Sequence, residues 1–433
     1  MKNITIISYF ILLIIGVNTN FLRYLEKSSY DYSSYSATSS NTNLSGQTLS
    51  SSTADHSVVY ITNSGITISN SNLNKESGVS TNTENSEFYG VNAAVLVQGG
   101  GLTITSGTIT TKAKGANALC ATNNGKVTIT GTTITSTGSS SARGLHATYG
   151  GSITATNVKI TSTGGSCATL ATDRGEGTVS CANCNLSTAG AGSPLIYSTG
   201  DITVSGTTGT ASGAQMVVVE GKNTATVKGS SKLYCTGVGN RNDVDKCGIM
   251  LYQSMSGDAN SGTSTFNCES SNMEILSFSD VYSSAPMFFI TNTDAEINLT
   301  GCSFTYGSGI FLSVAGTSEW GKSGENGGDV TLTLTNQEIE GDFVVDKNSE
   351  LTIILKNSSI KGKINNAKTA SVLKITLDKD SSITLTGNSY YTSLDNADSS
   401  GNNIKTGSYT FSTYSNGNFY KISLFILLSF LLF

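Results

Sequence analysis

A repeat of about 25 residues in the middle of the chain restricts the possible folds more than any other feature. The stretch 91–110 recurs at 116–135 and again at 142–161. Aliphatic anchors of successive copies follow at intervals of 23 to 26 residues: Leu102, Val127, Ile153, Val179 and Ile202. Related copies lie at 65–73, 296–304, 329–339, 350–360 and 373–385. Repeats of this length are typical of stacked units, because one unit cannot bury its apolar face alone.

Each copy has the pattern of β-strands. Apolar residues such as Leu102, Ile104 and Ile109 alternate with Thr, Ser or Gly, which is a period of two, and no helical period is present. Pairs such as Gly99-Gly100 separate the strands and suit tight bends through positive φ. Stacking equivalent strands about 4.8 Å apart closes their hydrogen bonds and fills one interior with like side chains. We therefore predict an all-β fold, a right-handed parallel β-helix with coils of about 20 to 26 residues.

The composition excludes several other classes. Only 2 Pro accompany 47 Gly, which excludes collagen and Pro-rich stalks. A β-sandwich would also have many short strands, but it would not repeat every 25 residues or so with matched anchors. Lys and Arg number 25 against 30 Asp and Glu, so the net charge of −5 leaves no basic surface for nucleic acid.

Both ends carry the patterns of processing signals, and these divide the chain into four parts. Residues 1–19 are predicted to be a secretory signal peptide, because their apolar run is too short to cross a membrane without tilting or thinning it. Residues 20–56 form a Ser/Tyr-rich segment that is either disordered or an N-terminal cap. The β-helix is predicted over 57–410. Residues 411–433 end in a hydrophobic stretch typical of a GPI-attachment signal.

The expected lipid attachment point lies at the small residues Ser415 and Asn416, shortly before the apolar tail. The polar spacer after them is shorter than usual, so a short uncleaved tail is the alternative. Either ending predicts a secreted protein held at the cell surface, with its membrane contact at the C-terminus. Four N-x-[ST] triplets are candidate glycosylation sites on this route: Asn43, Asn185, Asn298 and Asn357.

On these repeats the chain resembles the pectin-lyase-like group of right-handed parallel β-helices, which includes adhesin-like surface proteins of microbes. The resemblance covers residues 57–410 and concerns architecture rather than particular residues. It implies either a polysaccharide lyase or hydrolase, or a non-catalytic protein displayed on a surface. The enzymes of the group carry a cluster of carboxylates, often with His, Lys or Arg, on one exterior sheet.

The chain lacks the complete catalytic set of such enzymes. Asn292-Thr293-Asp294 matches the first piece of the polygalacturonase signature, but the Asp-Asp, Gly-His-Gly and Arg-x-Lys pieces are absent. Of the 2 histidines, His146 takes the repeat position of Cys120 and is expected to be a partly buried structural imidazole. His56 is expected to be solvated. We predict no catalytic residue and no cofactor.

One acidic loop has the spacing of a metal site. Asp243 and Asp245 could place two oxygens on one calcium ion, but Arg241 and Lys246 would compete for the carboxylates. We favour a structural loop closed by a disulfide between Cys235 and Cys247, and we predict no metal site.

The 8 cysteines of a secreted chain indicate an oxidising compartment. Cys268 and Cys302 take similar slots in neighbouring coils, so we predict a disulfide between them. Cys181 and Cys184 have the spacing of a redox or zinc motif, yet no second Cys or His pair completes a metal site. The remaining two are expected to be buried thiols: Cys120 and Cys167.

The leading functional hypothesis is a non-catalytic, adhesin-like rod that contacts wall polysaccharide or other cell-surface glycans. The competing class is a polysaccharide lyase or glycoside hydrolase of the same fold. A third is ice binding, because T-x-T pairs at 103/105, 128/130 and 154/156 would form rows similar to those of ice-binding β-helices. Thr is also simply the favoured polar residue of exposed strands. Three tyrosines could stack on sugars or pack in the core: Tyr282, Tyr390 and Tyr391.

Overall fold

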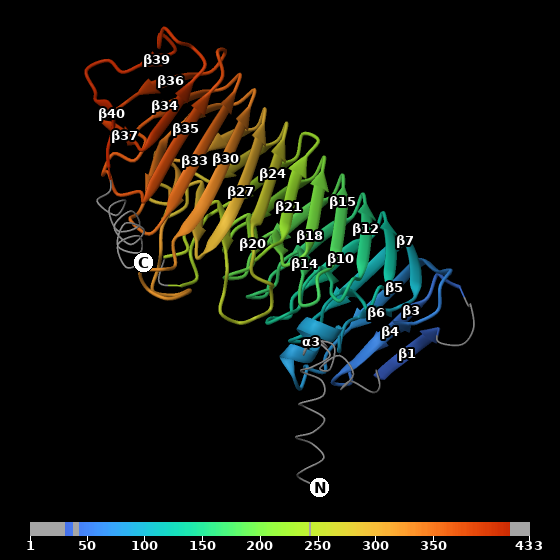
Figure 1. The fold of residues 1–433 in the computed structure, drawn as a ribbon. Coiled ribbons are helices and arrows are strands. Elements are labelled where there is room, and N and C mark those ends of the chain that lie inside the picture. Colours follow the sequence, from blue (N-terminus) through green and yellow to red (C-terminus); the bar gives the residue numbers. More distant parts are fainter. Residues whose placement is uncertain (1–30, 38–42, 242–243, 416–433) are drawn as a thin grey trace, which may run out of the picture.

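Parallel strands stacked coil upon coil make up almost the whole molecule (Figure 1). The computed structural model describes residues 31–37, 43–241 and 244–415. The strands of the largest sheets pair with the equivalent strands of the preceding and following coils, in parallel register. The predicted all-β parallel β-helix is therefore confirmed. Its first strands already lie in the Ser/Tyr-rich segment that precedes the repeats.

The coils have three faces. Face A is a 12-stranded sheet: β1 (Asp31–Ala37), β4 (His56–Ile61), β6 (Val95–Gln98), β8 (Leu119–Thr122), β11 (Leu145–Ala147), β14 (Leu170–Thr172), β17 (Ile196–Ser198), β20 (Val217–Glu220), β23 (Ile249–Tyr252), β26 (Phe288–Thr291), β29 (Ile310–Val314) and β32 (Asp342–Val345). A short sheet continues this face: β37 (Ser389–Tyr391) and β40 (Phe411–Thr413).

Faces B and C belong to one 22-stranded sheet, because two strands run through both faces: β5 (Ile66–Lys75) and β7 (Gly101–Thr111). Face B contains β2 (Leu44–Ser45), β9 (Lys126–Thr130), β12 (Ser152–Thr156), β15 (Thr178–Ala182), β18 (Asp201–Ser205), β21 (Thr224–Lys228), β24 (Ser264–Glu269), β27 (Thr293–Thr300), β30 (Gly328–Thr335), β33 (Glu350–Lys356), β35 (Val372–Leu377) and β38 (Ser393–Asn396).

Face C contains β3 (Thr48–Ser51), β10 (Thr133–Ser136), β13 (Lys159–Ser162), β16 (Asn185–Thr188), β19 (Thr208–Ala211), β22 (Lys232–Cys235), β25 (Asn272–Ile275) and β28 (Ser303–Thr305). A separate four-stranded sheet follows on the same side of the coils: β31 (Glu338–Glu340), β34 (Ser359–Gly362), β36 (Ser382–Leu385) and β39 (Ile404–Lys405).

One continuous column of aliphatic and aromatic side chains fills the interior. The alternation seen in the repeats is an alternation of burial, since Val127 and Ile129 of β9 are buried while Lys126 and Thr128 are exposed. Residues in register on face A stack inward from coil to coil: Val95, Leu119, Leu145, Leu170, Ile196, Val217, Ile249 and Phe288. Burying such a column is the main stabilising contribution, because each coil supplies apolar area to both of its neighbours.

The corner between faces B and C has the same backbone geometry in coil after coil. Its first residue has a φ of 47° to 62° and is Gly, Asn or Ser, the types that adopt this conformation at least cost: Gly131, Asn157, Asn183, Gly206, Ser230, Ser270, Gly301, Asn336 and Asn357. The next residue is called the corner residue here. In several coils it donates its backbone N–H to a hydroxyl of the following corner residue, as from Thr207 to Ser231 at 3.1 Å.

The polar insertion before the second repeat forms α3 (Thr83–Tyr89), which lies beside β6 (Figure 1). The side chain of Asn82 accepts hydrogen bonds from the N–H groups of Glu84 and Asn85, so it caps the helix start. Gly90, with a φ of 71°, ends it. Within the described part of the chain, no helix has the length and apolar composition to cross a membrane.

Candidate functional site

The outer side of face A is covered, which distinguishes this face from face B. Apart from Tyr197, which is half-buried, the outward residues of its middle coils are less than a tenth exposed: Leu96, Cys120, His146, Ala171, Val218, Met250 and Phe289. The outward residues of face B are exposed, such as Thr128 and Thr154, or half-exposed, such as Thr203. Segments between the strands must therefore lie over face A.

Two groups of segments form this cover. Toward the N-terminal coils α3 lies over β11, where the Nε2 atom of His146 is 2.7 Å from the carbonyl oxygen of Glu87. Toward the C-terminal coils, Trp320 from the loop before β30 packs in one cluster with Val218, Met250 and Phe289. The gap between the two covers is the cleft described next.

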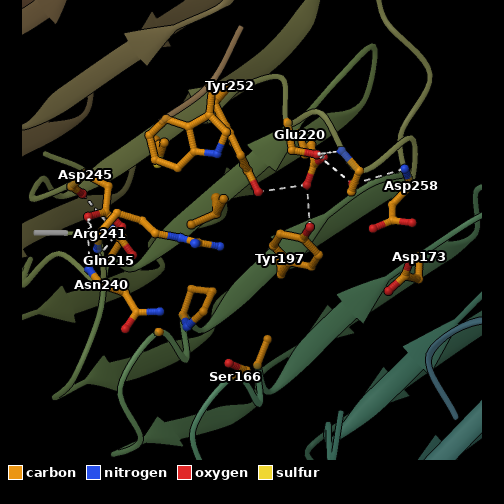
Figure 2. Close-up of a pocket in the computed structure, with 18 of the residues that line it drawn as sticks. Ser166, Asp173, Tyr197, Gln215, Glu220, Asn240, Arg241, Asp245, Tyr252 and Asp258 are labelled. Atoms are coloured by element: carbon orange, nitrogen blue, oxygen red, sulfur yellow. Dashed lines mark hydrogen bonds between the residues drawn. The ribbon is translucent and has the colours of Figure 1, made fainter. Parts of the chain in front are cut away.

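A cleft of about 380 Å³ lies on face A between α3 and Trp320. Its charged and aromatic lining comes from coils far apart in the sequence: Glu87, Arg143, Asp173, Tyr197, Glu220, Arg241, Asp245, Tyr252, Asp258 and Trp320. Figure 2 shows Tyr197 and Tyr252 pointing toward Glu220, with Asp173 and Asp258 on one side and Asp245 at the other end.

Glu220 is the centre of a hydroxyl network in this cleft. Its carboxylate accepts hydrogen bonds from Tyr252 at 2.8 Å, from Tyr197 and from Ser254. The carboxylate side chain is almost fully buried. Burial and the neighbouring Glu220 charge hold the pKa of both tyrosines well above the usual value, so both stay protonated and donate. The network fixes two aromatic rings in the wall of the cleft.

Two ion pairs border this network. Arg143 contacts Asp173 at 2.6 Å, and Arg174 contacts Asp258 at 2.5 Å. Burial raises the pKa of Asp173 to about 6, although Arg143 opposes the shift and Asp258 adds to it. The Arg174 guanidinium also stacks 3.8 Å from the ring centroid of Phe88 in α3. These contacts connect α3 to a loop on the other side of the cleft.

The lining has an excess of acid. Five carboxylates line it against two guanidinium groups: Glu87, Asp173, Glu220, Asp245 and Asp258 against Arg143 and Arg241. The aromatic part is Tyr252 with Trp320, whose ring centroids are 5.2 Å apart. The cleft therefore offers carboxylate acceptors beside aromatic rings.

Asp245, a candidate calcium ligand from its spacing, closes a loop instead. Its carboxylate accepts the backbone N–H groups of Asn240 and Arg241, both at 2.9 Å. The Gln215 amide donates to its carbonyl oxygen at 2.6 Å. Asp243 lies outside the described residues, and among those described no cluster of three or more His, Cys, Asp or Glu could hold a metal ion.

His146 is fully buried and occupies the register position of Cys120, as expected from the repeats. Burial and the nearby Arg143 lower the pKa of His146 to about 3, so the ring stays neutral and donates to the Glu87 carbonyl. Burial raises the pKa of the Cys120 thiol to about 12. This neighbouring Cys and His pair is therefore structural. His56, in β4, is half-buried.

The predicted disulfide between Cys268 and Cys302 is confirmed. A second disulfide, between Cys181 and Cys184, joins face B to the corner within one coil and explains their close spacing. The two thiols expected to be buried, Cys120 and Cys167, are buried and free.

The predicted disulfide between Cys235 and Cys247 is wrong, because both are free in the structure. Cys235 belongs to the interior column, whereas Cys247 packs in the cluster outside face A with Met250 and Trp320. The two side chains thus belong to opposite sides of the coil wall. The loop between them is closed by Asp245 instead.

The Thr row of face B runs further than the motif suggests. The first position of each T-x-T pair has a hydroxyl in seven successive coils, because Ser180 and Thr226 stand in register with the threonines. These residues are Thr67, Thr103, Thr128, Thr154, Ser180, Thr203 and Thr226. At the second position of the pair, Ala182 and Lys228 interrupt the row of hydroxyls. Differences in coil length are absorbed between the faces.

Other residues singled out in the sequence lie away from the cleft. Asn43, Asn185 and Asn357 are exposed and Asn298 is half-exposed. Ser415 is exposed, while Asn416, the signal peptide and the apolar tail lie outside the described residues. Asp294 borders a smaller pocket of about 250 Å³. The three tyrosines pack in the structure: Tyr282 and Tyr391 against the core, and Tyr390 beneath Lys368.

No protein-family model matches the chain, and no curated protein matches it. Of the charged and aromatic cleft residues, the sequence pointed only to Arg241 and Asp245, since most of the others lie in segments between the strands. One signal was present in the sequence, because Glu220 ends an otherwise aliphatic strand. A charged residue is rarely fully buried unless it is paired.

Proposed function

We propose that the protein is a secreted, surface-displayed β-helix that binds polysaccharide in the face A cleft. The observation that carries the proposal is the buried Glu220 network beside Tyr252 and Trp320. Sugar hydroxyls need strong acceptors, which carboxylates supply, and the C–H faces of sugar rings pack on aromatic side chains. The pectin-lyase-like resemblance supports the same class of ligand.

The acidic lining favours neutral glycans over uronides. Five carboxylates face only three arginines, the lining Arg143 and Arg241 and the Arg174 paired with Asp258, and this excess of acid would repel the carboxylates of pectin or alginate. A uronide lyase needs the opposite, cationic groups that neutralise the substrate. Neutral wall polysaccharide therefore suits this cleft better than a uronide polymer.

The test measures binding of the purified protein to neutral oligosaccharides such as β-glucan and mannan fragments, with oligogalacturonate for comparison. Glu220→Gln is expected to weaken binding of neutral sugar about tenfold, since hydrogen bonds to a charged group contribute about 1.5–3 kcal/mol. Ser256→Trp, at an exposed position on the rim, is expected to block the cleft without removing any lining carboxylate.

Thr226→Ala on face B is the matched control and should leave glycan binding unchanged. Binding that is lost with Thr226→Ala but kept in both cleft variants would contradict the assignment to face A. So would a preference for oligogalacturonate over every neutral sugar.

A glycoside hydrolase is the second candidate, favoured by one observation. Burial raises the pKa of Asp173 to about 6 and the nearby Asp258 adds to the shift, so the Asp173 carboxyl can hold a proton near pH 6. Such a pair could protonate the leaving oxygen and activate the water that adds to the sugar. Release of reducing ends by the wild type, abolished in Asp173→Asn, would establish hydrolysis. Unchanged polymer length over a long incubation would exclude it.

A further inference from the structure

Face C is interrupted at one place in the stack. Among the strands that the structure describes, β28 pairs only with β25, and β31 pairs only with β34. The same two coils remain paired on the other faces, through β27 with β30 and β29 with β32. The coils are therefore joined on two faces and open on the third.

The corner residues show that the coils are held apart here. In several other coils the corner N–H donates to the short hydroxyl of a Ser or Thr, as from Gln337 to Ser358 at 3.0 Å. At the opening the acceptor is the longer side chain of Gln337, which accepts from the Cys302 N–H at 2.7 Å. The same carboxamide donates to the Cys302 carbonyl oxygen at 2.6 Å. One side-chain amide thus takes the place of a peptide group.

The other end of the opening is bridged in a similar way. The hydroxyl of Tyr306 donates to the carbonyl oxygen of Glu340 at 2.6 Å. Between the two bridges lies a cavity of about 630 Å³ that reaches Phe304 and the core residue Phe311. Phe304 stands in register with the buried Met273 but is itself only half-buried, because its next neighbour is missing.

Large aromatic side chains explain why these coils separate. Phe288, Phe304 and Phe311 contact one another with ring centroids 5.3 to 5.7 Å apart. Tyr306 and Phe343 pack on the same Phe311 ring. Rings of this volume exceed the aliphatic side chains that fill the earlier coils, so direct pairing on face C is prevented.

The two edges of the opening present peptide groups at the spacing of a β-strand. In a parallel ladder, alternate residues direct their N–H and C=O groups to opposite neighbours. Because Ser303 donates to Ser271, the groups of Phe304 are directed at the opening. Because Gly341 donates to Lys361, the same reasoning directs the groups of Glu338 and Glu340 there. A β-strand repeats donors and acceptors at this interval, whereas a sugar chain does not.

Charge at the rim indicates the kind of strand. Glu338 and Glu340 are exposed on β31, and Glu274 lies on the neighbouring β25. Lys361 pairs with Glu340 at 2.8 Å, but no ion pair among the described residues engages Glu274 or Glu338. Outward-facing basic residues on an added strand would meet these carboxylates.

We propose that the opening between β28 and β31 binds an extended, basic peptide segment of a partner protein as an added parallel strand. One apolar side chain of the peptide enters the cavity between Phe304 and Ile339, and its neighbours place Lys or Arg at the acidic rim. The added strand replaces the Gln337 and Tyr306 bridges with backbone hydrogen bonds. This site is separate from the face A cleft.

The probe is a fluorescent octapeptide of alternating Lys and Val, with Lys-Pro and Glu-Val octapeptides as controls. Binding to the full chain is followed by fluorescence anisotropy, and its location by hydrogen exchange. The Lys-Val peptide is expected to bind and to slow exchange at β28 and β31. The Lys-Pro peptide cannot donate ladder hydrogen bonds at its prolines, so it should bind at least tenfold more weakly.

Gln337→Ser is the decisive variant, because it removes the side-chain amide that the added strand must displace, while the aromatic rings still hold the coils apart. We expect it to strengthen binding of the Lys-Val peptide at least threefold while leaving glycan binding in the face A cleft unchanged. Glu338→Lys should weaken the same peptide and favour Glu-Val. No binding of Lys-Val by the wild type, or equal binding by Gln337→Ser, would overturn the proposal, as would protection at strands other than β28 and β31.

Discussion

The position of a residue in the coil decides its chemistry in this protein. His146 and Asp173 are both buried near Arg143, yet burial lowers the pKa of the histidine and raises that of the aspartate. In each case burial disfavours the charged form. A neutral imidazole therefore lies beneath α3 beside the cleft, and the cleft itself contains a carboxyl that can retain a proton.

At this scale His146 gives a prediction about acid stability. Between pH 6.5 and about 3 the unfolded chain protonates this histidine while the folded protein does not, so the free energy of unfolding falls as the pH falls. Asp173 has a raised pKa, so it has the opposite effect: it increases the free energy of unfolding as the pH falls from about 6 to 3.8. A difference between variants is needed to separate the two residues.

His146→Gln should keep the hydrogen bond to Glu87 and lose the titration. Relative to this variant, wild-type stability should drop by a few kcal/mol between pH 6.5 and 4, from the size of the shift. Urea unfolding at several pH values measures it, with His56→Gln as the control for loss of an imidazole. Parallel pH profiles of wild type and His146→Gln would contradict the buried, neutral ring.

The two disulfides should differ in their effect on stability. Cys268 and Cys302 are 34 residues apart, whereas Cys181 and Cys184 are 3 apart. Closing the longer loop removes more entropy from the unfolded chain, about 4 kcal/mol against about 2 kcal/mol. Each pair has one cysteine in the core and one at a corner, so double Cys→Ala variants lose similar packing. Equal losses in urea unfolding would show that chain entropy is not the main effect.

At the scale of the element, the corner between faces B and C holds neighbouring coils in register. Ser231 is fully buried, accepts from the Thr207 N–H at 3.1 Å and donates to the Lys228 carbonyl at 2.6 Å. One hydroxyl therefore serves two backbone groups that water cannot reach. The strand ladder on either side depends on this register.

Ser231→Ala should cost about 1–3 kcal/mol, because it leaves a buried N–H without an acceptor. Thr203→Ala, on the outer side of face B, should cost about 0.5 kcal/mol or less. Chemical denaturation of the two variants compares them directly. A larger loss at Thr203 would mean that the outer Thr row, not the corner, secures the coils.

At the scale of the whole molecule, each coil is stabilised by its two neighbours, and the end coils have only one. The interior column runs from Val58 to Leu385 in a single cluster. The cover over face A adds contacts to the middle coils alone. Stability should therefore be graded along the rod.

Hydrogen exchange should show this gradient. We expect the slowest exchange in β15, β18 and β21, and the fastest in β2 and β39, which have few ladder partners. Mass spectrometry of peptic fragments measures it. Uniform protection along the chain would indicate that the solenoid unfolds as one unit rather than from its ends.

The coil itself was predictable from the sequence, because alternation and repeat length are local properties. The register of Leu102, Val127 and Ile153 follows from their spacing alone. Cys268 and Cys302 could be paired for the same reason. The interruption of face C was not predictable, since it depends on how several aromatic rings from different coils share one interior.

The cleft could not be predicted from the sequence. Arg174 and Asp258, which face each other across it, are 84 residues apart, and α3 reaches His146 from 59 residues upstream. The repeat determined the solenoid, its core and its hydroxylated faces, because burial of alternate residues repeats with every coil. Only the tertiary structure decided which irregular segments meet over face A, because their positions depend on packing between coils that no local pattern records.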